Sequence, residues 1–216
     1  MSITGTMGTI PERLEQFKIA LDSIIDQVDI LHILFNKYET IPFPLPSKCI
    51  PVVDPTNQYN SLGRLKAIEK EKGIIFSFDD DIIYPPDYKE RMLKHLNNCM
   101  VCVHGSRLLK DFNSYKRHRK ITHFCSRLRE SSQVDVPGVG TSVWDNSQLK
   151  FSFDMVDNFE VGADVWVAYF CARVNLPIIS IKRIKSWLKP IETTNKSLFF
   201  TINNKKRTKF VKEKLC

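Results

Sequence analysis

The sequence predicts an α/β fold, a single domain with a mainly parallel central sheet flanked by helices. Apolar residues recur in turn at helical spacing and in short strand-like runs, and strands that alternate with helices typically form parallel sheets. The length of 216 residues corresponds to a single domain, or at most a small domain with two lobes, at about 150 residues per domain. Hydrophobic residues make up 43% of the chain and charged residues 26%, which excludes disordered and collagen-like classes.

The first half of the chain alternates between the two periodicities. Apolar residues at every third or fourth position predict a helix over Pro11–Val28. A short apolar run predicts a strand over Asp29–Phe35, and the proline-rich stretch that follows holds one short strand at Cys49–Val53. Helical spacing returns over Leu62–Glu71, and a continuous apolar run predicts a buried strand over Ile74–Phe78.

The second half continues the alternation less regularly. Two consecutive prolines at 85 and 86 precede a helical pattern, and a strand follows at Met100–Val103. Polar and basic residues dominate Leu108–Glu130, where we expect loops or a mobile flap. The pattern predicts a helix over Ala163–Val174 and a last strand over Pro177–Ile181.

The net charge of +8 is concentrated near the C-terminus. From Lys182 onward there are 11 basic and 2 acidic side chains, a net of +9, whereas the preceding residues have 21 basic and 22 acidic side chains, a net of −1. We therefore expect a domain over residues 1–195 and a basic segment over 196–216 that could be a linker to a further domain. Such a segment can contact phosphates, nucleic acid or an anionic membrane surface, and a solvated end is its simpler interpretation.

Cysteine usage and the N-terminus indicate a cytoplasmic protein, located in the host cytoplasm if the chain is viral. The six cysteines are scattered, and Cys99 and Cys102 form a CxxC pair inside an apolar stretch, without the second pair that a zinc site needs. We find no secretory signal and no apolar run of the roughly 18 residues that a membrane span requires. Reduced thiols are therefore expected.

Three consecutive carboxylates, Asp79, Asp80 and Asp81, directly follow the apolar strand Ile74–Phe78. Like charges this close repel one another and oppose burial, so a positive group should compensate them. Strand alternation would aim Asp79 and Asp81 to one side and Asp80 to the other. Two carboxylates on one side suit Mn²⁺ or Mg²⁺, which complete their coordination with water and substrate phosphates. The alternative is a solvated acidic turn, or a helix N-cap before Pro85.

Several segments in the same order resemble one enzyme family. Ser2–Gln27 resembles its opening strand, loop and first helix, Asn60–Ala67 the helix ahead of its acidic motif, and Asp79–Asp81 its Asp-x-Asp motif. Pro137–Ser142 resembles its acceptor-side segment, and Asn158–Trp166 resembles the segment that supplies its catalytic carboxylate. The family is that of the GT-A glycosyltransferases, especially the family 2-like ones and those of large algal viruses. The resemblance extends over most of the chain.

The resemblance implies a GT-A (Rossmann-like) fold and a metal-dependent, inverting transfer of a sugar from a nucleotide-diphosphate sugar to an acceptor hydroxyl. A UDP-sugar is the expected donor, and a glycan or glycoprotein is the expected acceptor. Nucleic acid is not an expected partner, and membrane contact would be at most peripheral, through the basic tail.

The same resemblance implies residues of the donor site. Thr4, Gly5 and Thr6 would lie along the nucleotide, with Arg13 near it. Asn36 stands where members of the family often have an acidic residue that recognises the base. An amide can still form a hydrogen bond with uracil or with another base, so the identity of the base stays open.

Metal binding and proton transfer are implied for the remaining acidic residues. Asp79 and Asp81 would bind Mn²⁺ or Mg²⁺, with Asp79 near the ribose or the sugar. Asp80 would also lie on the donor side. Asp164 would be the general base. A cation offsets the charge of a departing diphosphate, and a base typically contributes about 10²–10⁴-fold. A base opposite the leaving group predicts inversion. The simpler interpretation of Asp164 is a helix N-cap.

Other polar and aromatic residues are weaker candidates. His104 ends a strand and could reach the site, and the three tryptophans could stack on a sugar, although core positions are more usual for them. The basic run Lys116–Lys120 and the cluster Lys182, Arg183 and Lys185 could contact phosphate or be solvated.

Two other functions compete with glycosyl transfer. A nucleotidyltransferase or sugar-phosphate-activating enzyme also combines an α/β sheet with paired acids. Such enzymes usually open with a longer glycine-rich, basic phosphate loop, whereas Thr4–Thr9 here contains no Lys or Arg. A nucleic-acid-binding module would use the basic tail and would bind with a steep salt dependence. That module leaves Asp79–Asp81 unexplained.

Overall fold

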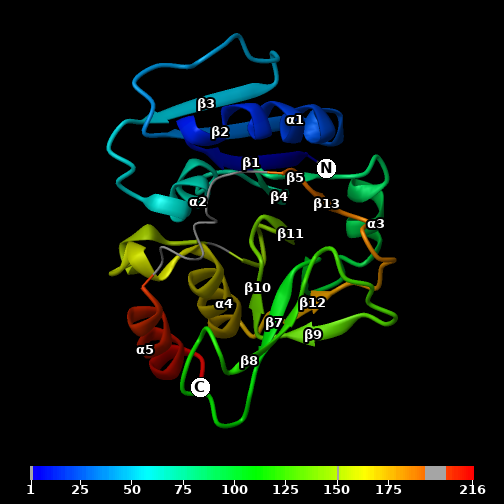
Figure 1. Ribbon diagram of the computed structural model, residues 1–216, viewed down its shortest axis with the longest axis vertical. Coiled ribbons are helices and arrows are strands. Elements are labelled where there is room, and N and C mark those ends of the chain that lie inside the picture. Colours follow the sequence, from blue (N-terminus) through cyan, green and yellow to red (C-terminus); the bar gives the residue numbers. More distant parts are fainter. Residues whose placement is uncertain (1, 150, 193–202) are drawn as a thin grey trace.

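The computed structural model describes residues 2–149, 151–192 and 203–216 (Figure 1). Its centre is an eight-stranded sheet in the order β3-β2-β1-β4-β11-β6-β12-β9. These strands are β1 (Ile3–Thr9), β2 (Ile30–Asn36), β3 (Cys49–Asp54), β4 (Ile74–Asp79), β6 (Met100–Cys102), β9 (Ser132–Val134), β11 (Thr141–Asp145) and β12 (Ile178–Ser180). The strands β3, β2, β1 and β4 are parallel, whereas β11 is antiparallel to both β4 and β6. The predicted α/β class is confirmed, with a mixed and mostly parallel sheet.

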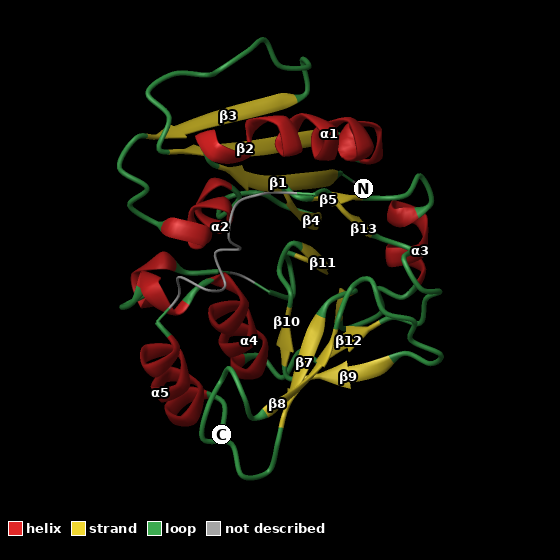
Figure 2. Ribbon diagram, viewed as in Figure 1, coloured by secondary structure: helices red, strands yellow, loops and turns green. Residues whose placement is uncertain are grey.

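Helices cover both faces of the sheet (Figure 2). They are α1 (Leu14–Ile24), α2 (Gly63–Ala67), α3 (Tyr88–Lys94), α4 (Ala163–Arg173) and α5 (Asn204–Lys214). One hydrophobic cluster joins α1 and α3 to the sheet, and a second joins α2, α4 and α5 to it. On β4, Phe76 and Phe78 belong to the first cluster and Ile75 to the second. Successive strand residues point to opposite faces, so the central strands are buried on both sides.

The two predicted helices of the first half are shorter than their apolar patterns. The pattern over Pro11–Val28 forms α1 with a 3₁₀ turn at each end, Pro11–Arg13 and Ile25–Gln27. Helix α2 follows a 3₁₀ turn at Asn60–Leu62 and ends at Ala67. Such turns are frequent at helix ends because a tighter hydrogen-bond pattern satisfies the terminal backbone groups.

The region 108–130, where loops were expected, contains one strand, β8 (Arg119–Thr122), and it belongs to a small second sheet. Strands β7 (Gly105–Leu108) and β8 (Arg119–Thr122) pair, and β10 (Val136–Pro137) adds a third strand to them. A separate antiparallel pair joins β5 (Ile82–Ile83) to β13 (Lys189–Pro190). The strand β8 has two exposed and two half-buried residues, so it lacks the apolar alternation that identifies a strand in sequence.

The basic C-terminal segment is not a solvated end where the structure describes it. Helix α5 buries Arg207, Phe210 and Val211, and the ring of Phe210 lies 4.6 Å from that of Trp166 on α4. The expectation of a solvated tail is therefore wrong for this helix. The predicted domain boundary at residue 195 lies outside the described residues.

The remaining expectations concern thiols and membrane spans. All six cysteines are free, and Cys99, Cys102 and Cys171 are buried. Within the described ranges, no helix has the length and apolar character needed to cross a membrane.

Candidate functional site

A pocket of about 540 Å³ lies where the central parallel strands end. The last residues of β1, β2 and β4 are Thr9, Asn36 and Asp79, and all three line it. Neighbouring parallel strands bring their carboxyl ends to one edge of a sheet, which is where ligands bind in α/β folds. The other charged residues in its lining are Arg13, Lys37, Arg64, Asp80, Asp81, Glu160, Asp164 and Arg207.

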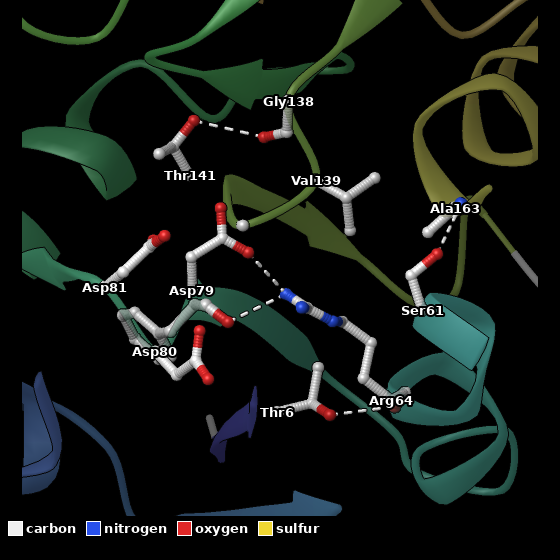
Figure 3. A network of polar contacts seen from close by, with 12 residues as sticks. Thr6, Ser61, Arg64, Asp79, Asp80, Asp81, Gly138, Val139, Thr141 and Ala163 are labelled. Carbon is white, nitrogen blue, oxygen red and sulfur yellow. Dashed lines mark hydrogen bonds and ion pairs between the residues drawn. The ribbon is translucent and has the colours of Figure 1, made fainter. Parts of the chain in front are cut away.

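Two arginines compensate the acidic turn at the end of β4. Arg64 on α2 donates from Nη1 to Oδ1 of Asp79 at 2.9 Å and to the carbonyl of Phe78 at 2.8 Å (Figure 3). Arg13 donates from Nη1 to Asp80 at 2.8 Å and to Asp81 at 3.0 Å. These ion pairs are the positive groups that three adjacent carboxylates require.

The predicted alternation of the three aspartates is wrong. Strand β4 ends at Asp79, so the period of two stops there. Asp80 and Asp81 instead turn toward the same guanidinium, that of Arg13. Asp79 and Asp81 are partly exposed, with side-chain exposures of 38% and 28%, whereas Asp80 is buried at 6%. Asp79 and Asp81 are therefore the pair available to a ligand, as the sequence spacing predicts. They are available because both are partly exposed, and not because strand alternation aims them to one side.

The acidic turn has more negative charge than its surroundings stabilise. Burial, followed by the charge of Asp79, raises the pKa of Asp81 from 3.8 to about 6, against the opposing effect of Arg13. Burial also raises the pKa of Asp80, again opposed by Arg13. A cation placed beside these carboxylates would relieve this repulsion.

A tyrosine and a glycine fix the position of Asp79. The hydroxyl of Tyr84 accepts the backbone N–H of Asp79 at 2.8 Å and donates to the carbonyl of Gly140. The Asp79 carboxylate packs directly against Gly140, where an added Cβ would overlap it. Only glycine at position 140 leaves room for the Asp79 carboxylate. This close contact makes Gly140, just before β11, part of the pocket wall.

Asp164 lies in the first turn of α4 and also lines the pocket. Its Oδ1 accepts the backbone N–H of Val139 at 3.0 Å, and the adjacent Ala163 N–H donates to the hydroxyl of Ser61 at 3.1 Å (Figure 3). Burial raises the pKa of Asp164, while the charge of Arg207 and the Val139 amide lower it. The N-cap residue of α4 is Gly162, and Asp164 is the second residue of the helix, so the N-cap interpretation of Asp164 is wrong.

The structure brings most of the predicted site residues together. Arg13, Asn36, Asp79, Asp80, Asp81 and Asp164 all line the one pocket.

Thr4, Gly5 and Thr6 do not reach the pocket. They lie buried within β1, which continues to Thr9, so it is Gly8 and Thr9 that line the pocket. Thr6 acts only indirectly, because its hydroxyl donates to the carbonyl of Arg64 at 2.7 Å.

The weaker candidates His104, Arg183 and the three tryptophans contact other parts of the fold and do not line the pocket. His104 packs against His123, with ring centroids 5.3 Å apart, and burial lowers its pKa to about 4. The guanidinium of Arg183 donates to the carbonyls of Ile181 and His123 at 2.8 and 2.9 Å. The three tryptophans are core residues, with at most 7% exposure. None of these side chains lines the pocket.

Sequence reasoning missed several lining residues. Arg64 lies in the segment Asn60–Ala67 that resembles the family, but no role was predicted for it. The need for a positive group beside three adjacent carboxylates could have identified it. Ser61 and Glu160 also belong to segments that carry the resemblance. Asn203 and Arg207 come from the basic C-terminal segment, where nothing distinguishes them from the neighbouring polar residues.

The described residues offer limited protein ligands for a metal. They contain no group of three or more His, Cys, Asp or Glu side chains arranged to hold a metal ion. Asp79 and Asp81 supply two hard oxygen donors, and each carboxylate has one oxygen on an arginine. A Mn²⁺ or Mg²⁺ ion bound here would therefore take its other ligands from water and substrate, as these ions commonly do.

Comparison with known proteins gives no family for this chain, since no protein-family model and no curated protein sequence matches it.

Proposed function

We propose that this protein is a metal-dependent, inverting glycosyltransferase of the GT-A type, which transfers a sugar from a nucleotide-diphosphate sugar to an acceptor hydroxyl. The observation that carries the proposal is one pocket, at the carboxyl ends of parallel strands, lined by both the arginine-bound acidic turn Asp79–Asp81 and the separate carboxylate of Asp164. Its volume of about 540 Å³ is in the range typical of small-molecule sites.

The donor nucleotide would lie beside Arg13 and Asn36. The side-chain oxygen of Asn36 is buried and has no hydrogen-bond partner among the described residues. A buried carbonyl without a donor costs free energy, and an N–H group of a ligand would satisfy it. Uracil presents such an N–H, which supports a UDP-sugar as the donor.

Asp79 and Asp81 would hold Mn²⁺ or Mg²⁺. The donor set fits a hard cation. Burial and the negative charge of Asp79 together raise the pKa of Asp81, and a cation would offset that charge. When bound, the ion supplies charge stabilisation for the departing diphosphate. Arg13 and Arg64 hold one oxygen of Asp81 and Asp79 respectively, which orients the carboxylates before any ligand arrives.

Asp164 would act as the general base. It takes the proton of the acceptor hydroxyl while the hydroxyl oxygen bonds to the anomeric carbon. The bond from that carbon to the diphosphate oxygen breaks, and its electron pair leaves with the diphosphate. Attack from the side opposite the leaving group inverts the anomeric centre. Burial raises the pKa of Asp164, which makes it a stronger base than an exposed aspartate.

Calorimetry with UDP and a panel of nucleotide sugars tests the donor site. Binding is expected with Mn²⁺ and not with a chelator, and equal affinity in both conditions would reject the metal. The same panel can be screened by thermal stabilisation. Release of inorganic diphosphate from a nucleoside triphosphate and a sugar phosphate, with formation of a nucleotide sugar, would instead favour a nucleotidyltransferase.

Replacement of the base tests the transfer step. Asp164→Asn should bind the donor normally and lose about 10²–10⁴-fold in turnover. Asp157→Asn, at an exposed position outside the pocket, is the control. Near-normal turnover in Asp164→Asn would remove this residue from the mechanism.

A further inference from the structure

Helix α5 is anchored at several points to the part of the fold that holds Asp164. Lys206 forms an ion pair with Glu160 at 2.6 Å, and Val211 is fully buried. The side chain of Asn203 caps the helix by accepting the N–H groups of residues 205 and 206. Figure 1 shows α5 lying next to α4. The helix therefore forms a fixed wall of the pocket.

Arg207 is held in one orientation at this wall. Only 3% of the residue is exposed. Its Nε donates to the carbonyl of Val161 at 2.7 Å, and its guanidinium lies 4.8 Å from the centre of the Tyr115 ring. The backbone N–H of Tyr115 in turn donates to Thr208 of α5 at 3.0 Å. A buried cation needs a nearby negative charge to offset its lost hydration.

We infer that Arg207 is a positioning residue that keeps Asp164 in its carboxylate form, so that the C-terminal helix completes the acceptor side of the site. This inference rests on the proposed function for its catalytic meaning. Its geometric basis is that both side chains line the same pocket, and that Arg207 is buried and anchored by the carbonyl immediately before Gly162 and α4.

Charges from several elements act on Asp164. Arg207 has the largest effect among those that lower its pKa, followed by the Val139 amide, with a smaller contribution from Arg119 of β8, while Asp79 of β4 raises it. Burial raises the pKa of Tyr115 and of Cys102, and the Asp164 charge raises both further, so these two side chains also interact with Asp164. Removing Arg207 therefore takes away the main opposition to burial and to Asp79.

A pair of substitutions separates the charge of Arg207 from its hydrogen bond. Arg207→Gln keeps a donor for the Val161 carbonyl and removes the charge, whereas Arg207→Lys keeps the charge. Lys212→Gln removes an exposed charge from the same helix and is the matched control. Each variant is first checked for an unchanged melting profile.

Turnover is measured from about pH 5.5 to 8.5, which brackets the range where a general base is effective. Arg207→Gln should lose about tenfold or more at the acidic end of this range, recover part of that loss toward the alkaline end, and bind the donor normally. Arg207→Lys should restore most of the activity at low pH, and Lys212→Gln should match the wild type. The same pH dependence in Arg207→Gln and in the wild type would overturn the inference.

A readout that needs no turnover keeps the inference separate from the proposed function. The carboxyl carbon of Asp164 can be titrated by NMR in the wild type and in Arg207→Gln. The midpoint should move to higher pH in the variant, and an unchanged midpoint would overturn the inference. Failure of the wild type to bind any nucleotide sugar would instead reject the proposed function and leave this titration as the deciding measurement.

Discussion

Replacing Asp81 by asparagine is expected to stabilise the protein at neutral pH when no divalent cation is present. Burial and the charge of Asp79 raise the pKa of Asp81 from 3.8 to about 6 in the folded state. Because the folded pKa lies above the unfolded one, the folded state binds the proton more tightly, and stability falls as the pH rises through 6. A rise of about two pKa units corresponds to about 3 kcal/mol. Asparagine avoids this cost and still offers an oxygen to Arg13.

Urea unfolding between about pH 4 and 8, in the presence of a chelator, measures this effect. The curves of wild type and Asp81→Asn should meet near pH 4 and separate by up to about 3 kcal/mol above pH 6. Asp22→Asn, an exposed position on α1, is the control and should follow the wild type. Adding Mn²⁺ and UDP should stabilise the wild type more than Asp81→Asn. A variant that is less stable than the wild type at pH 7.5 would refute the reasoning, because the carboxylate would then be a net stabilising partner of Arg13.

Three further experiments test the packing of the pocket, of helix α5 and of the core. Gly140→Ala should weaken nucleotide binding because its Cβ displaces the Asp79 carboxylate; a dissociation constant equal to that of the wild type by calorimetry would contradict this. Phe210→Ala should lower the free energy of unfolding by about 3–5 kcal/mol, and a loss under about 1 kcal/mol would mean that α5 is not docked. A thiol reagent should label the three buried cysteines much more slowly than the other three, since burial raises the pKa of Cys102 to about 12, and rapid labelling of Cys102, followed by mass spectrometry, would argue against the buried core.

Local patterns predicted the parts of the site that follow directly from strand ends. The apolar run before Asp79 identified a buried strand, and its end placed three carboxylates at the edge of the sheet. Asn36 was expected through the resemblance to the family, and it lies at the end of β2. The prediction of the acidic turn succeeded because the period and the polar boundary lie within a few residues of each other.

The misplaced residues have a different cause. Strand β1 ends where its pairing with β2 and β4 ends, at Thr9 opposite Phe35 and Gly8 opposite Asp79. No local signal in the stretch before Ile10 marks that end, so nothing in the pattern corrects the placement of Thr4–Thr6 that the family resemblance implies.

The contribution of α5 depends on contacts between distant segments of the chain. Arg207 meets Val161, 46 residues away in sequence. A basic residue among many basic residues has no property that identifies this contact in advance. The same holds for Arg64, which reaches Asp79 across 15 residues.

The central position of β11 affects the order in which the sheet can be completed during synthesis. Strands β4 and β6 are translated before Thr141–Asp145, yet β11 lies between them and pairs with both. A chain that ends before Thr141 therefore leaves one edge of β4 and both edges of β6 unpaired, and exposed edges of this kind pair readily with other chains. A chain truncated before Thr141 is therefore expected to aggregate more readily than the full chain.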